Sequence, residues 1–569
     1  MDTNDNGKTI IRSESRSQKP KSGITRRDLM SKSASVAGTF ALTSAIGIAP
    51  KFIRPARAGA YAPGMTGGPT GFAGAERFQY NETMSEGRAI EGIKKLQAAG
   101  KAPKKLSMLL TDGAIGQITK PFPVGKIGGL DAFPDGAPSV KDVWERETGI
   151  EIEIIGAPAE DIFKKVMQDV TTGSGTFDIF TGPWNSTGDL ADANGIVNCD
   201  EYVAKYMPDW GDPERGTPTP EMEKLLYTYA GSYYAFSLDG DFQTWFYNRD
   251  LYENPDVRAL FEDKYDKQLG TPATWEDVDN ISEFFTGRDF GAGTMYGNGN
   301  LMSPFWGLAT FYARFASMAF PNNYFFDEEG RPALDSDLGI RCAEEHVRSF
   351  QWCPPDALTF TWAEAYNTMW NLQIPHTAIY TNLVKFGDGY NPDGTPKSKA
   401  TGKLSAHLPV GRDFDGKFNR RSVLYYHITG WISAKSQYPE AAYLFMQWLS
   451  STRTYTWMCG NPGGYFDPMQ QANFKEPLCE ATYHDYSMEF IPKTIARSVP
   501  SINFAGQTAF DNALDEELQA AITGQKTAAE AMRAASKKWQ RIIRKRQRKG
   551  ILDAIAASRQ TWPSIVDDS

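Results

Sequence analysis

The sequence predicts an α/β protein with more than one lobe, and three observations carry that prediction. Strand-like and helix-like segments alternate from residue 105 onward, which is typical of a parallel sheet covered by helices on both faces. The chain has 569 residues, which is too long for one ordinary core and suits two or three lobes. Near the start, paired arginines and an uncharged stretch mark off a leader from this body.

The leader has the organisation of an export signal. A basic segment containing Arg26 and Arg27 precedes the uncharged residues 34–49, and Ala-Arg-Ala at 56–58 forms a small-x-small cleavage site. This stretch is short for a membrane span, which needs about 20 predominantly apolar residues. We therefore expect residues 1–58 to be a cleavable signal peptide, with an uncleaved anchor as the alternative.

The paired arginines resemble the twin-arginine export signal. The segment Thr25–Met30 reads TRRDLM, with Leu29 and Met30 where that signal usually has Phe and Leu. The resemblance implies a periplasmic protein that the twin-arginine export machinery carries in a folded state. Because many cargoes of this route are redox enzymes, it also raises an oxidoreductase as a hypothesis.

Composition argues against several partners and cofactors. The leader carries 11 Lys and Arg against 4 Asp and Glu, so the formal charge falls from -9 for the full chain to -16 for the remaining 511 residues. Such an acidic body argues against a nucleic-acid partner. The five cysteines form no C-x-x-C, and the five histidines show no metal-ligand spacing. The glycines of 291–297 lack the dinucleotide-binding spacing. We expect no cofactor.

Cysteine pairing stays open from the sequence. In an oxidising compartment Cys342 could pair with Cys353, or Cys459 with Cys479.

The elements of the first lobe follow from local patterns. Residues 59–104 are expected to be an N-terminal extension on the surface, with a short helix at 85–99. Beyond it, β-branched alternation and helical periodicity predict strands and helices in turn. The expected order is a strand at 105–110, a helix at 139–148, a strand at 150–155, a helix at 159–172 and a strand at 177–180.

Later elements are predicted by helix caps and apolar faces. Thr274 is the expected N-cap of a helix that has Asp277 in its first turn and Trp275 on its buried face. Residues 439–449 supply a densely apolar helix. The capping box at 527–530 begins a long amphipathic helix near the end of the chain.

Four segments together resemble a known family. They are GSGTFDIFTGPWNSTGDLADANGIVNCDEYV, YYAFSLDGDFQTWFYNRDLY, GTPATWEDVDNISEFFTGRD and HITGWISAKSQYPEAAYLFMQWLSS. Their order and spacing resemble the extracellular solute-binding proteins of ABC importers, in the group that includes sugar and polyol binders. The segments FFTGRD and DGTPK are similar to those of glycerol-importer binding proteins.

The resemblance implies a fold and partners. The fold is that of type II periplasmic binding proteins, with two α/β lobes and a ligand cleft between them. The first lobe would comprise 105–243 and 430–500, and the second 244–429 and 501–569. The partners implied are a small polyhydroxylated solute and the membrane permease subunits of an ABC importer.

A polyhydroxylated ligand presents C–H faces and hydroxyl edges, so its site needs aromatic rings together with carboxylates or amides. Candidates lie at the expected lobe edges and crossings. Nine residues are expected to contact the ligand: Trp184, Asn185, Asp239, Asp241, Gln243, Trp306, Tyr380, Trp431 and Tyr465.

Two enzyme classes are the alternatives to a binding protein. A glycosidase needs two carboxylates about 5 to 9.5 Å apart, and Asp239 and Asp241 are the natural pair. The oxidoreductase suggested by the export signal finds no cofactor motif in the chain. Some expected contacts also have structural interpretations, since Trp184 could be a packed loop aromatic and the two aspartates could be turn residues.

Overall fold

The computed structural model describes residues 61–122, 125–127, 130–133, 137–320, 324–391, 393–546 and 548–563. The chain separates into two compact units, Met1–Pro55 and Ala56–Ser569, and every described residue belongs to the second. The expected signal peptide, with Arg26 and Arg27, lies outside the described residues. Within the described part of the chain, no helix has the length and apolar character that a membrane crossing requires.

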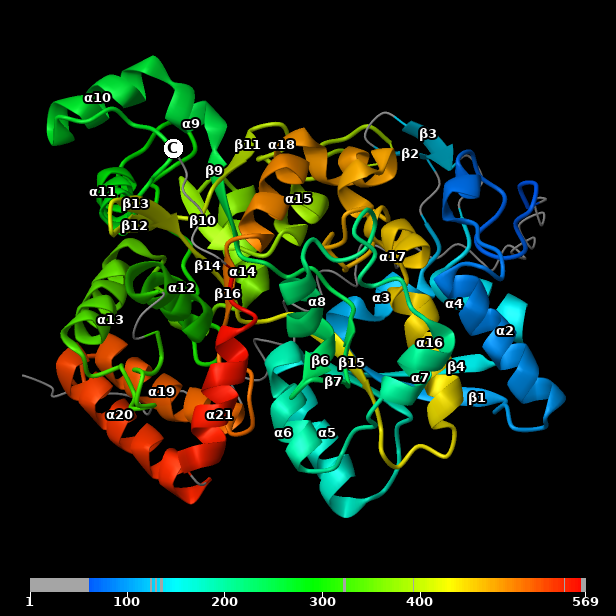
Figure 1. Ribbon diagram of the computed structural model, residues 1–569. Helices are drawn as coiled ribbons and strands as arrows, with labels where there is room; N and C mark the ends of the chain where they lie inside the picture. The colour runs from blue at the N-terminus through cyan, green and yellow to red at the C-terminus, as the bar shows by residue number, and fades with distance from the viewer. Residues whose placement is uncertain are drawn as a thin grey trace, which may run out of the picture. The chain divides into compact units, whose positions relative to one another are not determined.

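A five-stranded mixed sheet forms the centre of the first half of the fold (Figure 1). Its strand order is β4-β1-β5-β15-β8, in which β1 pairs in parallel with β4 and β5, and β15 is antiparallel to both of its neighbours. The parallel part confirms the α/β prediction. The strands are β4 (Glu151–Ala157), β1 (Lys105–Thr111), β5 (Ile179–Pro183), β15 (Ile428–Ile432) and β8 (Phe236–Ser237).

Helices cover both faces of this sheet, as strand alternation requires. In β1, Met108 belongs to the main core, whereas the adjacent Leu109 belongs to a second core cluster on the other face. The second cluster is completed by Ile162 and Val166 of α5 (Ala159–Thr172). On the main-core face pack α2 (Ser85–Ala98), α4 (Val140–Thr148) and α16 (Pro439–Ser450).

Local signals set these boundaries. Ser139 caps α4 through a capping box with Asp142, and Gly149 ends it in the left-handed conformation at φ 68°. The expected strand at 177–180 is displaced, because β5 runs to Pro183 and a 3₁₀ turn, Trp184–Ser186, follows it. Trp184 therefore begins a turn and is not part of an extended loop.

The N-terminal segment is more buried than expected. Helix α2 packs against α16, and Ala89 and Ile93 are fully buried in the main core. Gln447 of α16 donates to the carbonyl of Ser85 over 3.0 Å. The segment is therefore part of the core and not a surface wrapping, because its helix covers apolar surface of α16 that water would otherwise reach.

A three-stranded antiparallel sheet organises the second half, with the order β10-β9-β11. Its strands are β9 (Thr244–Asn248), β10 (His376–Ile379) and β11 (Leu404–His407). Four two-stranded pairings stand apart from the two sheets. In the first half β2 (Gly125–Ile127) pairs with β3 (Leu130–Phe133) and β6 (Thr228–Tyr229) with β7 (Ser232–Tyr233), and later in the chain β12 (Gly411–Phe414) pairs with β13 (Lys417–Arg420) and β14 (Ser422–Leu424) with β16 (Ser498–Pro500).

Most remaining helices pack around this second sheet and toward the end of the chain. Thr274 caps α11 (Trp275–Phe285) in a capping box with Asp277, as the sequence predicts. The C-terminal helices α19 (Gln507–Ile522) and α20 (Ala528–Lys545) pack on α13 (Asp337–Ser349) (Figure 1). The other helices are α3 (Ile115–Thr119), α6 (Thr187–Asp192), α7 (Asp200–Tyr206), α8 (Pro220–Tyr227), α9 (Arg249–Glu253), α10 (Pro255–Tyr265), α12 (Gly307–Ala319), α14 (Trp362–Trp370), α15 (Asn382–Gly387), α17 (Thr452–Cys459), α18 (Pro477–Ile495) and α21 (Arg548–Arg559).

The strands of each sheet come from the segments assigned to one expected lobe. Strand β15 returns from residue 428 to complete the sheet that begins at 105, whereas β9, β10 and β11 all lie between 244 and 407. Helix α18, which falls in the segment assigned to the first lobe, contacts α15 and β11 of the second as well as α17 and β2 of the first. The lobe boundaries stay a prediction. All five cysteines are buried free thiols, so neither of the two pairings that the sequence left open is formed.

Candidate functional site

The carboxyl ends of β5 and β8 and the start of β15 lie together at one end of the five-stranded sheet. Because β15 is antiparallel to β5 and β8, the residues before β15 lie beside the residues after those two strands. The Trp184 amide donates to the His427 carbonyl over 2.9 Å, and the Leu238 amide donates to the Ile428 carbonyl over 3.0 Å. Asp239 comes directly after Leu238, so chain segments almost 190 residues apart meet at this end of the sheet.

The second sheet brings further residues to the same region. Ile379 at the end of β10 pairs with Thr244 at the start of β9. Tyr380 and Gln243 are therefore neighbours at one end of that sheet. The hydroxyl of Ser422 donates to the Gln243 carbonyl over 2.8 Å and fixes this end of β9.

Asp467 connects the two groups of strand ends. Its amide donates to Asp239 Oδ1 over 2.7 Å. Its own Oδ2 accepts from Thr381 Oγ1 at 2.5 Å and from the Asn382 amide at 2.8 Å, and its Oδ1 accepts from the Tyr483 hydroxyl at 2.6 Å. Both oxygens of this carboxylate thus have hydrogen-bond donors, which favours its ionised form.

Asp239, Asp241 and Asp467 form one acidic cluster, hereafter the aspartate cluster. One carboxylate oxygen from each lies within 4.8 Å of the others, and the three side chains are buried. Three carboxylates at this spacing could serve as oxygen ligands for a hard divalent cation or as acceptors for hydroxyl or ammonium groups. The same geometry therefore fits several kinds of ligand.

Burial and mutual repulsion shape the electrostatics of the cluster. Burial, with the charges of neighbouring aspartates, raises the pKa of Asp239 and of Asp241 well above the usual range. Burial raises the pKa of Asp467 to about 6, against the opposing charge of Lys385. Lys385 donates to the Phe466 carbonyl over 2.6 Å, and burial lowers its pKa. One lysine thus accompanies three carboxylates.

Aromatic rings stand beside the cluster. The ring centroid of Tyr426 is 5.2 Å from that of Trp306 and 6.2 Å from that of Tyr380, and the last two are 6.2 Å apart. Besides burial, the charge of Asp241 raises the pKa of Tyr380, Tyr426 and Tyr465, which places all three phenols near that carboxylate. Rings and carboxylates together give the apolar and polar surfaces that carbohydrate recognition requires.

Polar atoms within this region are left without partners. Asp239 Oδ2, the Tyr380 hydroxyl and both amide atoms of Gln243 are buried and have no hydrogen-bond partner among the described residues. Buried polar atoms usually find partners, so unsatisfied groups gathered in one region indicate a place where a ligand supplies the missing bonds.

A strained backbone turn presents Trp306. Phe305 adopts φ 69°, a left-handed conformation that is unusual for a bulky residue. Its amide donates to Asp515 Oδ2 over 2.9 Å, and its carbonyl accepts from the Tyr425 hydroxyl at 3.1 Å. Two side chains from distant parts of the sequence hold this turn and so fix the ring of Trp306 against Tyr426.

The structure gathers five of the nine expected contact residues. They lie in or beside the aspartate cluster: Asp239, Asp241, Trp306, Tyr380 and Tyr465. Gln243 lies at the adjoining strand end.

The other three expected residues make structural contacts. Trp184 Nε1 donates to the Tyr425 carbonyl over 3.2 Å, and Asn185 Nδ2 donates to Ser501 Oγ over 3.3 Å. Trp431 lies in the second core cluster, where its Nε1 donates to Thr187 Oγ1 over 3.0 Å. The structure therefore does not bring Trp431 to the aspartate cluster, because its position in β15 directs it to the face covered by α5.

Three site residues were not expected from the sequence. Asp467 lies two residues after the expected Tyr465, and Tyr426 lies in the LYYHITGW segment before the return strand. Both could have been predicted, because Asp467 lies in the same loop as Tyr465 and Tyr426 lies in the crossing that leads to β15. Lys385 follows no motif, and only its fully buried position beside Asp467 identifies it.

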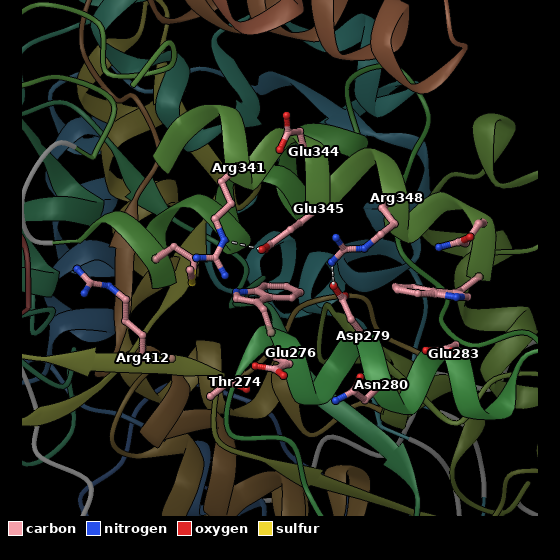
Figure 2. A pocket seen from close by; sticks show the side chains of 15 residues that line it. Thr274, Glu276, Asp279, Asn280, Glu283, Arg341, Glu344, Glu345, Arg348 and Arg412 are labelled. Atoms are coloured by element: carbon pink, nitrogen blue, oxygen red, sulfur yellow. Dashed lines mark hydrogen bonds and ion pairs between the residues drawn. The ribbon is translucent and has the colours of Figure 1, made fainter. Parts of the chain in front are cut away.

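A separate cavity of about 910 Å³ lies between α11 and α13. None of the nine expected contact residues lines it. Figure 2 shows charged side chains from both helices facing one another, with Arg348 bonded to Asp279 and Arg341 bonded to Glu345. These two ion pairs already satisfy four of its charged groups, whereas four unsatisfied buried polar atoms gather around the aspartate cluster, which is therefore the better candidate for a ligand site.

Comparisons with known proteins agree with this architecture. No curated protein matches the sequence. Among solved structures, an ABC transporter solute-binding protein of Agrobacterium radiobacter in complex with ribitol has a TM-score of 0.60 at 16% identity, covering 76% of this chain and 97% of that one. Maltose-bound MalE3 of T. maritima has a TM-score of 0.59 at 15% identity, covering 77% and 99%.

A third solved structure is an ABC transporter solute-binding protein of Agrobacterium vitis with bound D-mannitol, with a TM-score of 0.58 at 16% identity, covering 78% of this chain and 99% of that one. At these identities the likeness concerns the fold, which is that of type II periplasmic binding proteins. The family model for bacterial extracellular solute-binding proteins matches residues 132–455, which is more than half of the chain. The chain therefore belongs to the bacterial extracellular solute-binding protein family.

Proposed function

We propose that this protein captures a small polyol or sugar at the aspartate cluster and delivers it to the permease subunits of an ABC importer. The observation that carries the proposal is the cluster of three buried carboxylates beside the rings of Trp306, Tyr380, Tyr426 and Tyr465. The ribitol, mannitol and maltose bound to proteins of the same fold support this class of ligand.

The chemistry of the cluster suits such a ligand. Hydroxyl groups donate to carboxylates, and Asp239 Oδ2 has an open acceptor position. The C–H faces of a polyol pack on aromatic rings, which exclude water and thereby strengthen the hydrogen bonds. Glycerol, suggested by the similarity to glycerol-importer proteins, is the smallest candidate of this class.

Ligand entry requires the region to open, since Asp239 and Asp467 are fully buried. The two sheets are joined through the segment between β8 and β9 and through the longer segment between β11 and β15. Rotation about a few residues of such crossings is the hinge motion of periplasmic binding proteins. The ligand would then bridge residues of both sheets and stabilise the closed form.

Titration calorimetry and thermal shift with a panel of polyols and small sugars test the proposal. A ligand that binds only the folded protein stabilises it by about 2.7 kcal/mol at a concentration of 100 times Kd. We expect at least one member to bind, and Asp241→Asn to weaken it by a factor of ten or more. Asp413→Asn, at an exposed position in the hairpin of β12 and β13, is the matched control and should bind normally.

A panel without any binder would contradict the proposal. Release of product from glycosides, lost in Asp241→Asn, would instead support the glycosidase alternative.

Export to the periplasm through the twin-arginine route completes the proposed function. A variant with Arg26→Lys and Arg27→Lys should stay in the cytoplasm, which cell fractionation detects. Normal export of this variant would refute that route while leaving the binding function untouched.

A further inference from the structure

The charges of the aspartate cluster do not balance. Asp467 accepts three hydrogen bonds and interacts with the charge of Lys385, so these two residues form a compensated pair. Asp239 and Asp241 remain, and among the described residues Lys385 is the only cation that lowers the pKa of either one. The buried carboxylates of Asp239 and Asp241 thus have only the charge of Lys385 to compensate them, and Asp467 already interacts with that lysine.

Buried charge without compensation is unfavourable, and a protein resolves it by protonation or by binding a cation. Protonation of one aspartate would leave a single negative charge shared between Asp239 and Asp241. A neutral polyol leaves that charge uncompensated, whereas a ligand with one positive charge cancels it. The one uncompensated negative charge of this cluster is therefore matched by a monocation.

The aromatic rings also favour a cation. Trp306, Tyr380 and Tyr426 lie within 6.2 Å of one another, and the carboxylate of Asp241 influences both tyrosines. Ring faces attract ammonium groups, most strongly where water is excluded. The unpartnered Tyr380 hydroxyl and Asp239 Oδ2 supply acceptors for N–H and O–H groups of the same ligand.

We infer that the solute captured here is a polyhydroxylated amine, an amino polyol or amino sugar, whose ammonium group lies against Asp239 and Asp241 while its hydroxyls meet the surrounding rings and phenols. This inference rests on the proposed function and narrows its ligand class. A divalent metal fits less well, because both oxygens of Asp467 already accept hydrogen bonds and Lys385 repels a second strong positive charge.

The inference implies a defined pH dependence. An ammonium ligand needs one ionised carboxylate in the pair, so wherever Asp239 and Asp241 are both protonated in the empty site its binding releases one of the two protons. Its affinity should rise between pH 5 and pH 8, whereas a neutral polyol should show no such rise. The other titratable groups around the pair are Tyr366, Tyr380, Lys385, Tyr426, His427, Tyr455, Cys459, Tyr465, Asp467 and Tyr483.

Most of those groups keep one charge state across this range. Burial holds the pKa of His427 at about 3 and raises that of the phenols well above the usual value. Asp467 is the exception at about 6, and its ionisation adds to the rise in affinity for a cation.

A matched pair of ligands tests the inference on the full exported protein. D-Glucitol and 1-amino-1-deoxy-D-glucitol have the same carbon chain and differ by one amine in place of a hydroxyl. Titration calorimetry at pH 7.5 should give at least thirtyfold tighter binding of the amine, with proton release seen by comparing buffers of different ionisation enthalpy. Asp241→Asn should reduce the preference below about fivefold, and Asp413→Asn should retain it.

Each other result overturns the inference in a distinguishable way. Equal or tighter binding of glucitol would overturn the amine and leave the proposed function standing. Binding of either ligand that is lost in EDTA and restored by calcium would assign the cation role to a metal. Absence of binding across both ligands and the wider polyol panel would overturn the proposed function as well. Should Asp241→Asn not fold, the pH profile and proton release of the unmodified protein decide alone.

Discussion

Replacing Arg314 by alanine should destabilise the second half of the fold strongly. Arg314 is fully buried and bonds Asp279 at 2.9 Å and Glu345 at 3.0 Å, and its guanidinium lies 4.2 Å from the centroid of the Trp275 ring. Removing one member of a buried ion-pair network leaves uncompensated charge and typically costs 3 to 5 kcal/mol. The structure allows this magnitude to be refined.

Both carboxylates keep a second arginine after the substitution. Arg348 still bonds Asp279 at 2.7 Å and Arg341 still bonds Glu345 at 2.9 Å, although their side chains are 51% and 65% exposed. These pairs are partly screened by water and supply less compensation. We therefore expect a loss of about 3 kcal/mol in the free energy of unfolding, at the low end of that range.

Arg341→Ala is the matched control, since it also removes an arginine that pairs with Glu345, but one whose side chain is exposed. Its cost should stay below about 1 kcal/mol. Urea unfolding monitored by tryptophan fluorescence measures both. Combining Arg314→Met with Asp279→Asn and Glu345→Gln removes the buried charges together and should recover most of the loss. Equal costs for Arg314→Ala and Arg341→Ala would refute the reasoning.

Three further predictions concern a helix cap, a buried carboxyl and the thiols. Thr274→Ala removes the side-chain acceptor of the Asp277 amide and should cost about 1 kcal/mol in urea unfolding; an unchanged midpoint would contradict the capping role. Burial raises the pKa of Asp511 to about 7, so the folded state holds a proton that the unfolded state releases near pH 4. Stability should therefore fall as pH rises from about 4 to 7, and Asp511→Asn should flatten the dependence of Tm on pH relative to the unmodified protein. All five cysteines are buried free thiols, so Ellman's reagent should label them slowly in the folded protein and label five per chain after unfolding without reductant; fewer would reveal a disulfide.

Much of the α/β architecture could be predicted from the sequence, because its signals are local. The alternation in β4, the apolar face of α5 and the capping boxes at Ser139, Thr274 and Thr527 each involve residues within a few positions of one another. Hydrogen bonds and side-chain periodicities at that range hold whatever the rest of the chain does. The resemblance to solute-binding proteins placed Asp239 and Asp241 at a crossing between the expected lobes.

The burial of helix α2 in the core and the position of Trp431 could not be predicted from such local patterns. An amphipathic helix buries its apolar face wherever another element offers one, and α16 lies more than 340 residues farther along the chain. Trp431 follows a return crossing as expected, yet strand alternation directs it to α5 and away from the aspartate cluster.

By itself the sequence determined the type and order of the elements between residues 105 and 180 and three later helices, and its resemblance to solute-binding proteins placed Asp239 and Asp241 at an aromatic and acidic crossing. Only the tertiary structure decided which distant residues contact that crossing. Asp467 approaches from 228 residues away and Lys385 accompanies it, and together they leave Asp239 and Asp241 without sufficient positive charge. The reason is physical: local patterns fix backbone conformation, whereas the charge balance of a site depends on contacts between distant segments that exist only once the chain has closed upon itself.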